Sequence, residues 1–245
     1  MCSGDLQSEV DMIRSLTILS CLWMFSMTTT STRAELYPEI AKFVEQRKTE
    51  FGEISDERKT QLKQLAVYIQ KCDSQGKPAK LTFVCTHNSR RSHFTQVWAQ
   101  TAASHYGIKN VVSFSGGTEA TACNPRTIAA LKRSGFKADA TSPSDANPHY
   151  SVRFQDSGEP ITCFSKVYND APNPTSGYCA IMTCSQADKA CPTAPGCDLR
   201  VAIPYDDPKV SDGTPSESAT YDKRGEQIAR EMLYVMSLVH QPHVK

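Results

Sequence analysis

Residues 80–92, KLTFVCTHNSRRS, combine an apolar run that stops at a cysteine with a polar segment that ends in two arginines and a serine. The apolar run at residues 81–84 is typical of a buried strand, and apolar side chains recur at helical spacing after Ser92. The stretch therefore predicts a strand, a short loop and a helix. Five residues separate Cys85 from Arg91. That spacing allows the loop to curl so that its backbone N–H groups surround a tetrahedral oxyanion.

Arg91 and the expected helix determine what Cys85 can do. A guanidinium can close such a loop with two parallel N–H bonds to an oxyanion, and a helix N-terminus favours negative charge. Both features favour the thiolate form of Cys85, with Ser92 as a hydrogen-bond donor to its sulfur. We therefore expect Cys85 to be a nucleophile. The alternative is a buried cysteine at a strand end with Arg91 in a surface ion pair, because ten cysteines make a chance match to this spacing common.

At these residues the chain resembles the low-molecular-weight tyrosine phosphatase superfamily, which includes the thioredoxin-coupled arsenate reductases. Cys85, Asn88, Arg91 and Ser92 match the C-x-x-N-x-x-R-S loop of this superfamily. The resemblance implies that Cys85 and Arg91 are catalytic. It also implies an oxyanion-binding loop made of Thr86, His87, Asn88, Ser89, Arg90, Arg91 and Ser92.

Two positions of the loop differ from the superfamily pattern. His87 stands where glycine is usual, and histidine tolerates a positive φ angle better than most residues, which would let the loop keep its conformation. Arg90 stands where a second cysteine is common. We expect Arg90 to add positive charge beside the anion, and its presence removes a thiol that could protect Cys85 as a disulfide.

The resemblance covers residues 80–238 and implies an α/β fold, a three-layer sandwich around a mainly four-stranded parallel sheet. We expect a signal peptide or leader at residues 1–34, a helical extension at residues 35–78 and a phosphatase-like or arsenate reductase domain at residues 79–241. Residues 150–154 and 161–168 alternate in polarity and predict an inserted β-hairpin. The hairpin either covers or narrows the mouth of the oxyanion pocket, or is an addition on the protein surface without a role at the pocket.

The leader is predicted from an apolar run of signal-peptide length at residues 16–27, followed by the sequence TRA at residues 32–34. The run is too short to cross a bilayer comfortably, which indicates export, to the periplasm for example. Acidic residues at positions 5, 9 and 11 do not fit a signal peptide, although initiation at Met12 would remove them. The alternative is a buried or interfacial helix in a cytoplasmic protein, the compartment in which a thioredoxin-coupled reductase is expected.

A second pair of cysteines, Cys184 and Cys191, follows the apolar run at residues 178–183. Loops at the carboxyl ends of parallel strands lie together, so we expect Cys184 to face Cys85. Two such thiols can pass a disulfide outward by thiol exchange. The thioredoxin-coupled arsenate reductases carry this C-x6-C pair, whereas phosphatase relatives need neither cysteine. Zinc is the competing explanation, but no C-x2-C spacing or nearby histidine supports it, and we expect no metal and no cofactor.

The last expected strand, at residues 199–203, leads into the sequence PYDDP at residues 204–208. A carboxylic acid at this strand end can donate a proton to a departing oxygen. The superfamily keeps its general acid in an Asp-Pro pair, which the resemblance places at Asp207. Asp206 is then a loop carboxylate. Without the resemblance, an Asp-Pro pair would indicate only a turn.

A net charge of +1 and a pI of about 7.5 give no basic stripe for nucleic acid, so we expect a small oxyanion as substrate. The resemblance implies arsenate reduction in arsenical resistance. In that reaction Cys85 attacks arsenate, Asp207 protonates the leaving oxygen, Cys184 attacks the thiol-bound arsenic, and Cys191 presents a disulfide to thioredoxin. The alternatives are a phosphatase that hydrolyses phosphotyrosine or small phosphoesters through a phosphocysteine, and a sensor of anions or redox state. Arsenate and phosphate are nearly isosteric, so the loop residues fit both.

Overall fold

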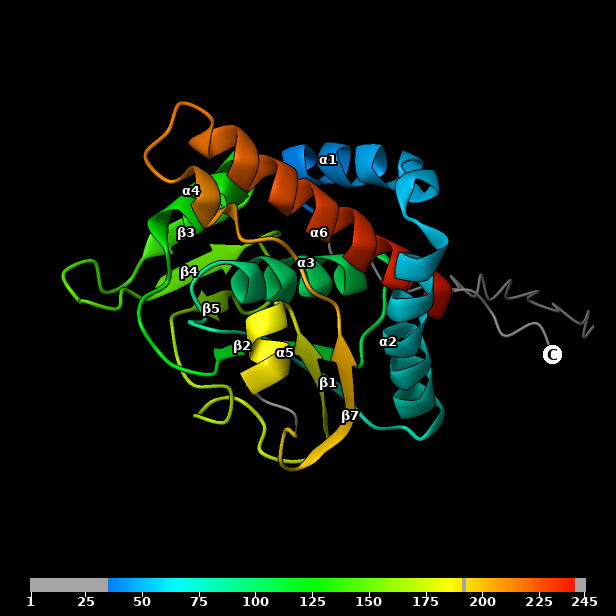
Figure 1. Cartoon of the computed structure of the whole chain (residues 1–245). Coiled ribbons are helices and arrows are strands. Elements are labelled where there is room, and N and C mark those ends of the chain that lie inside the picture. The colour runs from blue at the N-terminus through cyan, green and yellow to red at the C-terminus, as the bar shows by residue number, and fades with distance from the viewer. Residues whose placement is uncertain (1–34, 191–192, 241–245) are drawn as a thin grey trace, which may run out of the picture. The chain divides into compact units, whose positions relative to one another are not determined.

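The computed structural model describes residues 35–190 and 193–240 (Figure 1). The predicted leader and Cys191 lie outside the described residues. The helices are α1 (Pro38–Thr49), η1 (Phe51–Glu53), α2 (Asp56–Ser74), α3 (Arg91–His105), α4 (Pro125–Arg133), α5 (Ser185–Ala190), η2 (Pro208–Ser211) and α6 (Glu217–His240). The strands are β1 (Ala79–Cys85), β2 (Val111–Gly117), β3 (Lys137–Ala140), β4 (Tyr150–Arg153), β5 (Ile161–Cys163), β6 (Tyr178–Met182) and β7 (Cys197–Ala202). None of the helices in the described ranges is long and apolar enough to cross a membrane.

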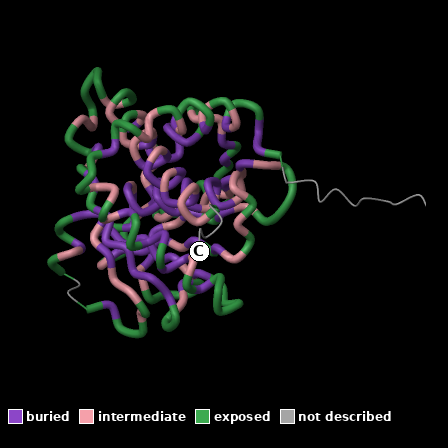
Figure 2. Tube along the Cα trace, turned by 90° about the vertical axis from the view of Figure 1, so that its right-hand side faces the viewer, coloured by how far each residue is buried: buried purple, intermediate pink, exposed green. Residues whose placement is uncertain are grey.

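The central sheet has four parallel strands in the order β2-β1-β6-β7, which confirms the predicted fold class. Alternate side chains of β1 point to opposite faces of the sheet. Leu81 and Phe83 join the larger core, which contains residues of α3 and α6, whereas Val84 packs with Met182 and with Ala187 of α5. The sheet is therefore buried on both faces, as parallel sheets require. In Figure 2 the buried segments run through the interior, and the exposed segments lie at the periphery.

The helical extension packs on the rest of the described chain. Helix α1 contacts α6, and α2 contacts α6, β1 and β7 (Figure 1). Helix α2 begins where Ser55 accepts a hydrogen bond from the backbone N–H of Arg58 at 3.2 Å, an N-cap that satisfies one of the free N–H groups of the first turn. Leu62, Leu65 and Ile69 are fully buried along one face of the helix. Burial of this apolar stripe stabilises the extension more than intrinsic helix propensity does.

The inserted segment differs from the predicted hairpin. Strands β4 and β5 pair as expected, but β3 joins them, so the insertion is a three-stranded antiparallel sheet in the order β3-β4-β5. The sequence of β3, KADA, contains no β-branched or aromatic residue, so its propensity gives no strand signal. Strand β5 ends at Cys163 because the chain then turns toward β2, where Gly117 N–H donates to the Lys166 carbonyl at 2.8 Å and Tyr168 N–H donates to the Gly117 carbonyl at 2.9 Å.

Candidate active site

The loop of residues 86–90 joins β1 to α3, and its carbonyl groups are held by the neighbouring segments. Thr118 N–H donates to the carbonyl of Cys85, and Glu119 N–H donates to that of Thr86, both at 3.0 Å. The Ser165 hydroxyl donates to the His87 carbonyl at 2.7 Å. Within the described part of the chain, no backbone N–H of residues 86–90 donates to a protein acceptor. Free N–H groups in a curled loop form a concavity that suits an anion.

Asn88 fixes the conformation of this loop. Its φ angle is 44°, and it is the only residue other than glycine with a positive φ in the described ranges. The expectation that His87 takes this conformation is therefore wrong, and the left-handed position falls one residue later. The Asn88 side chain accepts from the backbone N–H of Lys166 at 3.1 Å and donates to the hydroxyl of Ser92 at 2.9 Å. Asparagine suits the site because it tolerates left-handed backbone and its amide group both donates and accepts.

Cys85 lies at the base of the loop, with its sulfur 3.1 Å from the hydroxyl oxygen of Ser92. Because the Ser92 oxygen already accepts a hydrogen bond from Asn88, its own hydrogen is free to point at the sulfur. A hydroxyl that donates to sulfur stabilises the thiolate. The loop of residues 86–90 leads from Cys85 to the N-terminal end of α3, which begins at Arg91.

Arg91 reaches across to the segment that follows β7. One terminal nitrogen donates to the Tyr205 carbonyl at 3.1 Å, and the other donates to the Asp207 carboxylate at 2.7 Å. The third nitrogen, Nε, is buried and has no hydrogen-bond partner among the described residues. A buried guanidinium N–H without an acceptor is costly, so an oxyanion oxygen would complete this site.

The structure places Asp207 rather than Asp206 beside the loop. One Asp207 oxygen accepts from Arg91, and the other accepts from the backbone N–H of Lys209 at 3.1 Å, so Asp207 caps η2. The Asp206 side chain is 95% exposed and pairs with Arg224 at 3.2 Å. The geometry therefore gives only Asp207 access to a group bound at the loop.

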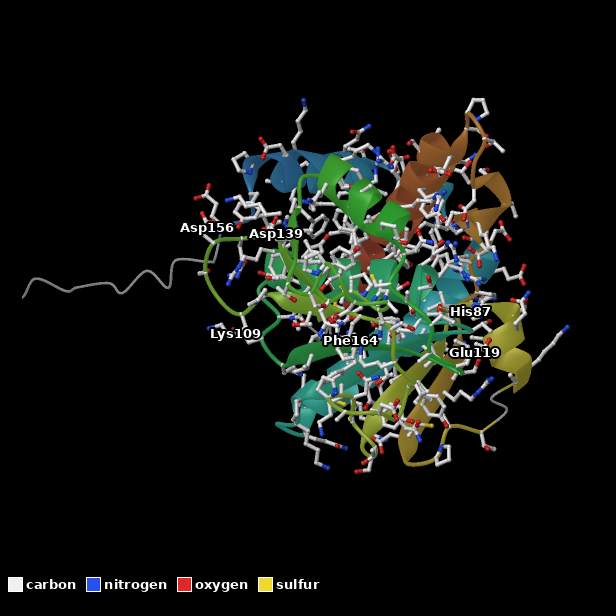
Figure 3. All side chains as sticks on the ribbon, turned by 90° about the vertical axis from the view of Figure 1, so that its left-hand side faces the viewer. His87, Lys109, Glu119, Asp139, Asp156 and Phe164 are labelled. Atoms are coloured by element: carbon white, nitrogen blue, oxygen red, sulfur yellow. The ribbon has the colours of Figure 1, made fainter. Side chains whose placement is uncertain are left out.

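His87 and Arg90, two predicted anion-binding residues, have other partners. His87 is partly exposed, and its ring nitrogen lies 2.9 Å from a carboxylate oxygen of Glu119, a proximity that Figure 3 shows. Arg90 donates to the Tyr221 hydroxyl at 2.6 Å and to the Asp212 carboxylate at 3.0 Å. The guanidinium of Arg90 therefore binds η2 and α6 instead of adding free charge beside the anion.

Cys184 lies against the loop, as expected for two loops at the carboxyl ends of neighbouring parallel strands. Its sulfur is 3.5 Å from the hydroxyl of Thr86, the residue after Cys85, and it accepts from the backbone N–H of Ala187 at 3.3 Å. Cys85 and Cys184 belong to one cluster of buried residues. The third predicted thiol, Cys191, lies outside the described residues.

The other buried cysteines fit the role of packing thiols. Burial raises the pKa of Cys163 to about 12 and raises the pKa values of Cys123 and Cys179 well above their ordinary value. Thiols with such pKa values stay protonated and react poorly. Within the described residues, no group of three His, Cys, Asp or Glu side chains is arranged to hold a metal ion.

A cavity of about 540 Å³ opens beside the loop. Its lining includes His87, Ser89 and Arg90 on one side, residues 121–125 on another, and Lys209. Sequence reasoning missed the residues around the loop that come from distant parts of the chain, namely Ser165, Lys166, Asp212 and Tyr221. Their only sequence signal is that they fall in the insertion and near the start of the last helix.

The chain is similar to low molecular weight tyrosine phosphatases in sequence and in fold. Residues 80–152 match the family model of low molecular weight phosphotyrosine protein phosphatase. No curated protein sequence matches the chain. A low molecular weight protein tyrosine phosphatase structure from T. tengcongensis is 14% identical over 65% of this chain and 98% of its own, with a TM-score of 0.42. A low molecular weight phosphotyrosine phosphatase from Vibrio cholerae O395 is 12% identical over 65% and 95%, with a TM-score of 0.44.

Reductases are also among the similar structures. The thioredoxin-dependent arsenate reductase of Corynebacterium glutamicum is 15% identical over 80% of this chain and 85% of its own, with a TM-score of 0.37. The loop of residues 85–92 lies inside the segment that the family model matches. Residues 80–152, which carry the loop, are therefore similar to the low molecular weight phosphotyrosine protein phosphatase family.

Proposed function

We propose that this protein is a cysteine-dependent oxyanion enzyme that reduces arsenate. The observation that carries the proposal is the position of Cys184, whose buried sulfur lies 3.5 Å from the Thr86 hydroxyl, next to the nucleophile. A phosphatase needs one thiol in this loop, whereas reduction of an oxyanion needs a second thiol to supply electrons. The free N–H groups of the loop and the unpartnered Nε of Arg91 supply the anion site.

In the proposed reaction, the Cys85 thiolate attacks arsenate, a sulfur–arsenic bond forms, and Asp207 protonates the oxygen that leaves as water. The Cys184 thiolate then attacks the sulfur of Cys85. A disulfide forms, the sulfur–arsenic bond breaks, and its electron pair reduces As(V) to As(III). This electron balance corrects the expectation that Cys184 attacks arsenic, because attack on arsenic would form no disulfide. Cys191, whose role is predicted from the sequence alone, would next attack Cys184 and free Cys85. A dithiol reductant of the thioredoxin type would then reduce the Cys184–Cys191 disulfide.

Phosphoester hydrolysis is the second candidate, and two observations favour it. The family model that matches residues 80–152 is that of a phosphatase. The cavity of about 540 Å³ beside the loop has room for the leaving group of an ester, whereas arsenate itself needs no such space. In this reaction Cys85 forms a phosphocysteine, Asp207 protonates the leaving alkoxide, and water then hydrolyses the intermediate.

Cys184→Ser separates the two reactions. In a reductase it should abolish multiple-turnover arsenate reduction, measured as NADPH oxidation with thioredoxin and thioredoxin reductase, and preserve hydrolysis of an aryl phosphate. Cys191→Ser should allow about one turnover and trap a Cys85–Cys184 disulfide that peptide mapping detects. Cys163→Ser, which removes a buried thiol elsewhere, is the control and should change neither reaction. A wild-type protein that hydrolyses phosphotyrosine but shows no arsenate-dependent NADPH oxidation would make the phosphatase the correct function.

A further inference from the structure

Two consecutive arginines of the loop hold the two ends of η2. Arg91 donates to Asp207, the residue directly before η2, at 2.7 Å. Arg90 donates to Asp212, the residue directly after η2, at 3.0 Å. The two residues that flank η2, one of them the candidate acid, are therefore each bound to one of these arginines.

The attachment at Asp212 is part of a closed set of three hydrogen bonds with Tyr221. Arg90 Nε donates to the Tyr221 hydroxyl at 2.6 Å, and that hydroxyl donates to the second Asp212 oxygen at 2.7 Å. Tyr221 is fully buried on α6, and the Arg90 side chain is only 12% exposed. Burial raises the pKa of Tyr221 to about 12, so its hydroxyl keeps the proton that it donates. Little exposure and two bonds to Arg90 make this attachment stronger than a surface ion pair.

The attachment at Asp207 weakens at the moment when Asp207 acts. A general acid must be protonated before it donates, and a protonated Asp207 has no charge to attract Arg91. An oxyanion at the loop also competes for the positive charge of Arg91. The pair between Arg90 and Asp212 keeps both charges in this state, because neither residue donates a proton in the reaction.

We propose that Arg90, Tyr221 and Asp212 are positioning residues that keep Asp207 over the loop while Asp207 is protonated and an oxyanion is bound. The proposal rests on the proposed function only in that Asp207 is the general acid, a role that it has in both candidate reactions. The Arg90 guanidinium is bound to Tyr221 and Asp212 in this arrangement, and the three residues act through η2.

Leaving-group dependence tests the proposal. Arg90→Met and Tyr221→Phe should lower kcat/KM for phenyl phosphate by about 10- to 100-fold, because a poor leaving group needs a well-placed acid. They should change kcat/KM for 2,4-dinitrophenyl phosphate less than about 3-fold, since that leaving group departs without a proton. The inhibition constant of inorganic phosphate should stay the same. Arg133→Met, which removes an arginine that pairs with Asp222 at 2.7 Å, is the matched control and should alter none of these values.

A double-mutant cycle shows whether Arg90 acts through Asp207. In an Asp207→Asn background, Arg90→Met should cause no further loss with phenyl phosphate, because the acid is already absent. An equal loss in both backgrounds, an equal loss with both esters, or a weaker inhibition by phosphate would mean that Arg90 acts on the anion itself, and the proposal would be wrong.

Backbone amide hydrogen exchange tests the proposal without any activity assay. With bound phosphate, Arg90→Met should accelerate exchange of the backbone N–H groups of Lys209 and Val210, which donate to Asp207 in the structure. Unchanged exchange would overturn the proposal. A wild-type protein that neither hydrolyses esters nor reduces arsenate would instead refute the proposed function, and the exchange result would still show whether Arg90 holds η2.

Discussion

Asp207 and its neighbour Asp206 differ in position and in exposure. Asp207 contacts the arginine of the loop, whereas Asp206 is exposed and contacts Arg224. A proton donor must lie within hydrogen-bond reach of the departing oxygen, so position decides between two chemically identical side chains.

We predict that Asp207→Asn lowers the rate of the chemical step by about 10²–10⁴-fold and leaves oxyanion binding intact, because it removes only proton donation. Asp206→Asn is the matched control and should change the rate less than about 3-fold. Single-turnover rates with an aryl phosphate or with arsenate, together with phosphate inhibition constants, measure both effects. Equal losses in the two variants would show that the acid has been assigned to the wrong carboxylate.

His93, on α3, links the stability of the fold to pH. The side chain is fully buried, and one ring nitrogen lies 3.2 Å from the hydroxyl of Ser115. Burial, with a smaller effect from the nearby Lys166 charge, lowers the pKa of His93 from 6.5 to about 3. In the unfolded chain a histidine takes up a proton below about pH 6.5, whereas native His93 does not. The contribution of neutral His93 to the free energy of unfolding is therefore fully present above about pH 6.5, and it falls as the pH decreases toward 3.

We predict that the wild-type protein loses about 2 kcal/mol of unfolding free energy between pH 7 and pH 5 through His93 alone. His93→Gln should remove this part of the pH dependence, whatever its effect on stability at pH 7. Urea unfolding at the two pH values gives the difference. His149→Gln, at a half-buried histidine that stacks on Phe164, serves as the control. If wild type and His93→Gln have the same pH dependence, His93 is not the residue responsible.

At the scale of elements, α2 supports the segment that leads to the candidate acid. Arg58, in its first turn, donates to the Pro204 carbonyl at 3.0 Å and lies over the ring of Tyr205, with 4.7 Å between guanidinium carbon and ring centroid. The same guanidinium pairs with Glu231 of α6 at 2.9 Å. Glu231 is 2% exposed, so the pair is buried on the side of the carboxylate. The extension therefore braces the residues that precede Asp207.

We predict that Arg58→Met destabilises the protein by about 3–5 kcal/mol, because it leaves the buried Glu231 carboxylate without its cation. The double variant Arg58→Met/Glu231→Met should recover most of the loss, since no buried charge remains. Lys63→Met, on the exposed side of the same helix, should change stability less than about 0.5 kcal/mol. Urea unfolding measures all three. A double variant less stable than Arg58→Met would show that the pair itself stabilises the fold.

The elements also show what the sequence could and could not predict. Strand β1, the loop and α3 were predictable because a buried apolar run, a cysteine and a helical pattern follow one another within residues 80–105. The proximity of Cys184 to the loop followed from the rule that carboxyl ends of parallel strands lie together. Strand β3 has no residues with strong β propensity, and its pairing with β4 creates the strand.

The partners of Arg90 could not be predicted either, because they too depend on tertiary packing. Tyr221 and Asp212 lie 131 and 122 positions away in the sequence, and only the packing of η2 and α6 brings them to the loop. Spacing rules relate neighbours along one element, so they contain no information about such long-range pairs. The contact of the Asn88 side chain with the backbone N–H of Lys166, 78 positions away, is a similar case.

At the scale of the whole molecule, the first described residues already pack against the rest of the described chain. Leu36 and Tyr37 are buried, and the backbone N–H of Tyr37 donates to the Phe154 carbonyl at 2.9 Å. Cleavage after Ala34 would therefore remove no residue that makes these contacts. We propose that residues 1–34 direct export and are then removed, on the basis of the apolar run at residues 16–27 and the TRA sequence at residues 32–34.

We predict that protein isolated from its native cell begins near Glu35, with residues 1–34 absent, because a signal peptide is cut at the small residue that follows its apolar run. N-terminal sequencing and intact mass measure this directly. The control is Leu19→Arg, which places a charge in the apolar run and should leave the uncleaved chain in the cytoplasm. A wild-type chain that retains Met1 would contradict export. It would place the thiols of Cys85 and Cys184 in the reducing compartment in which a thioredoxin-type reductant acts.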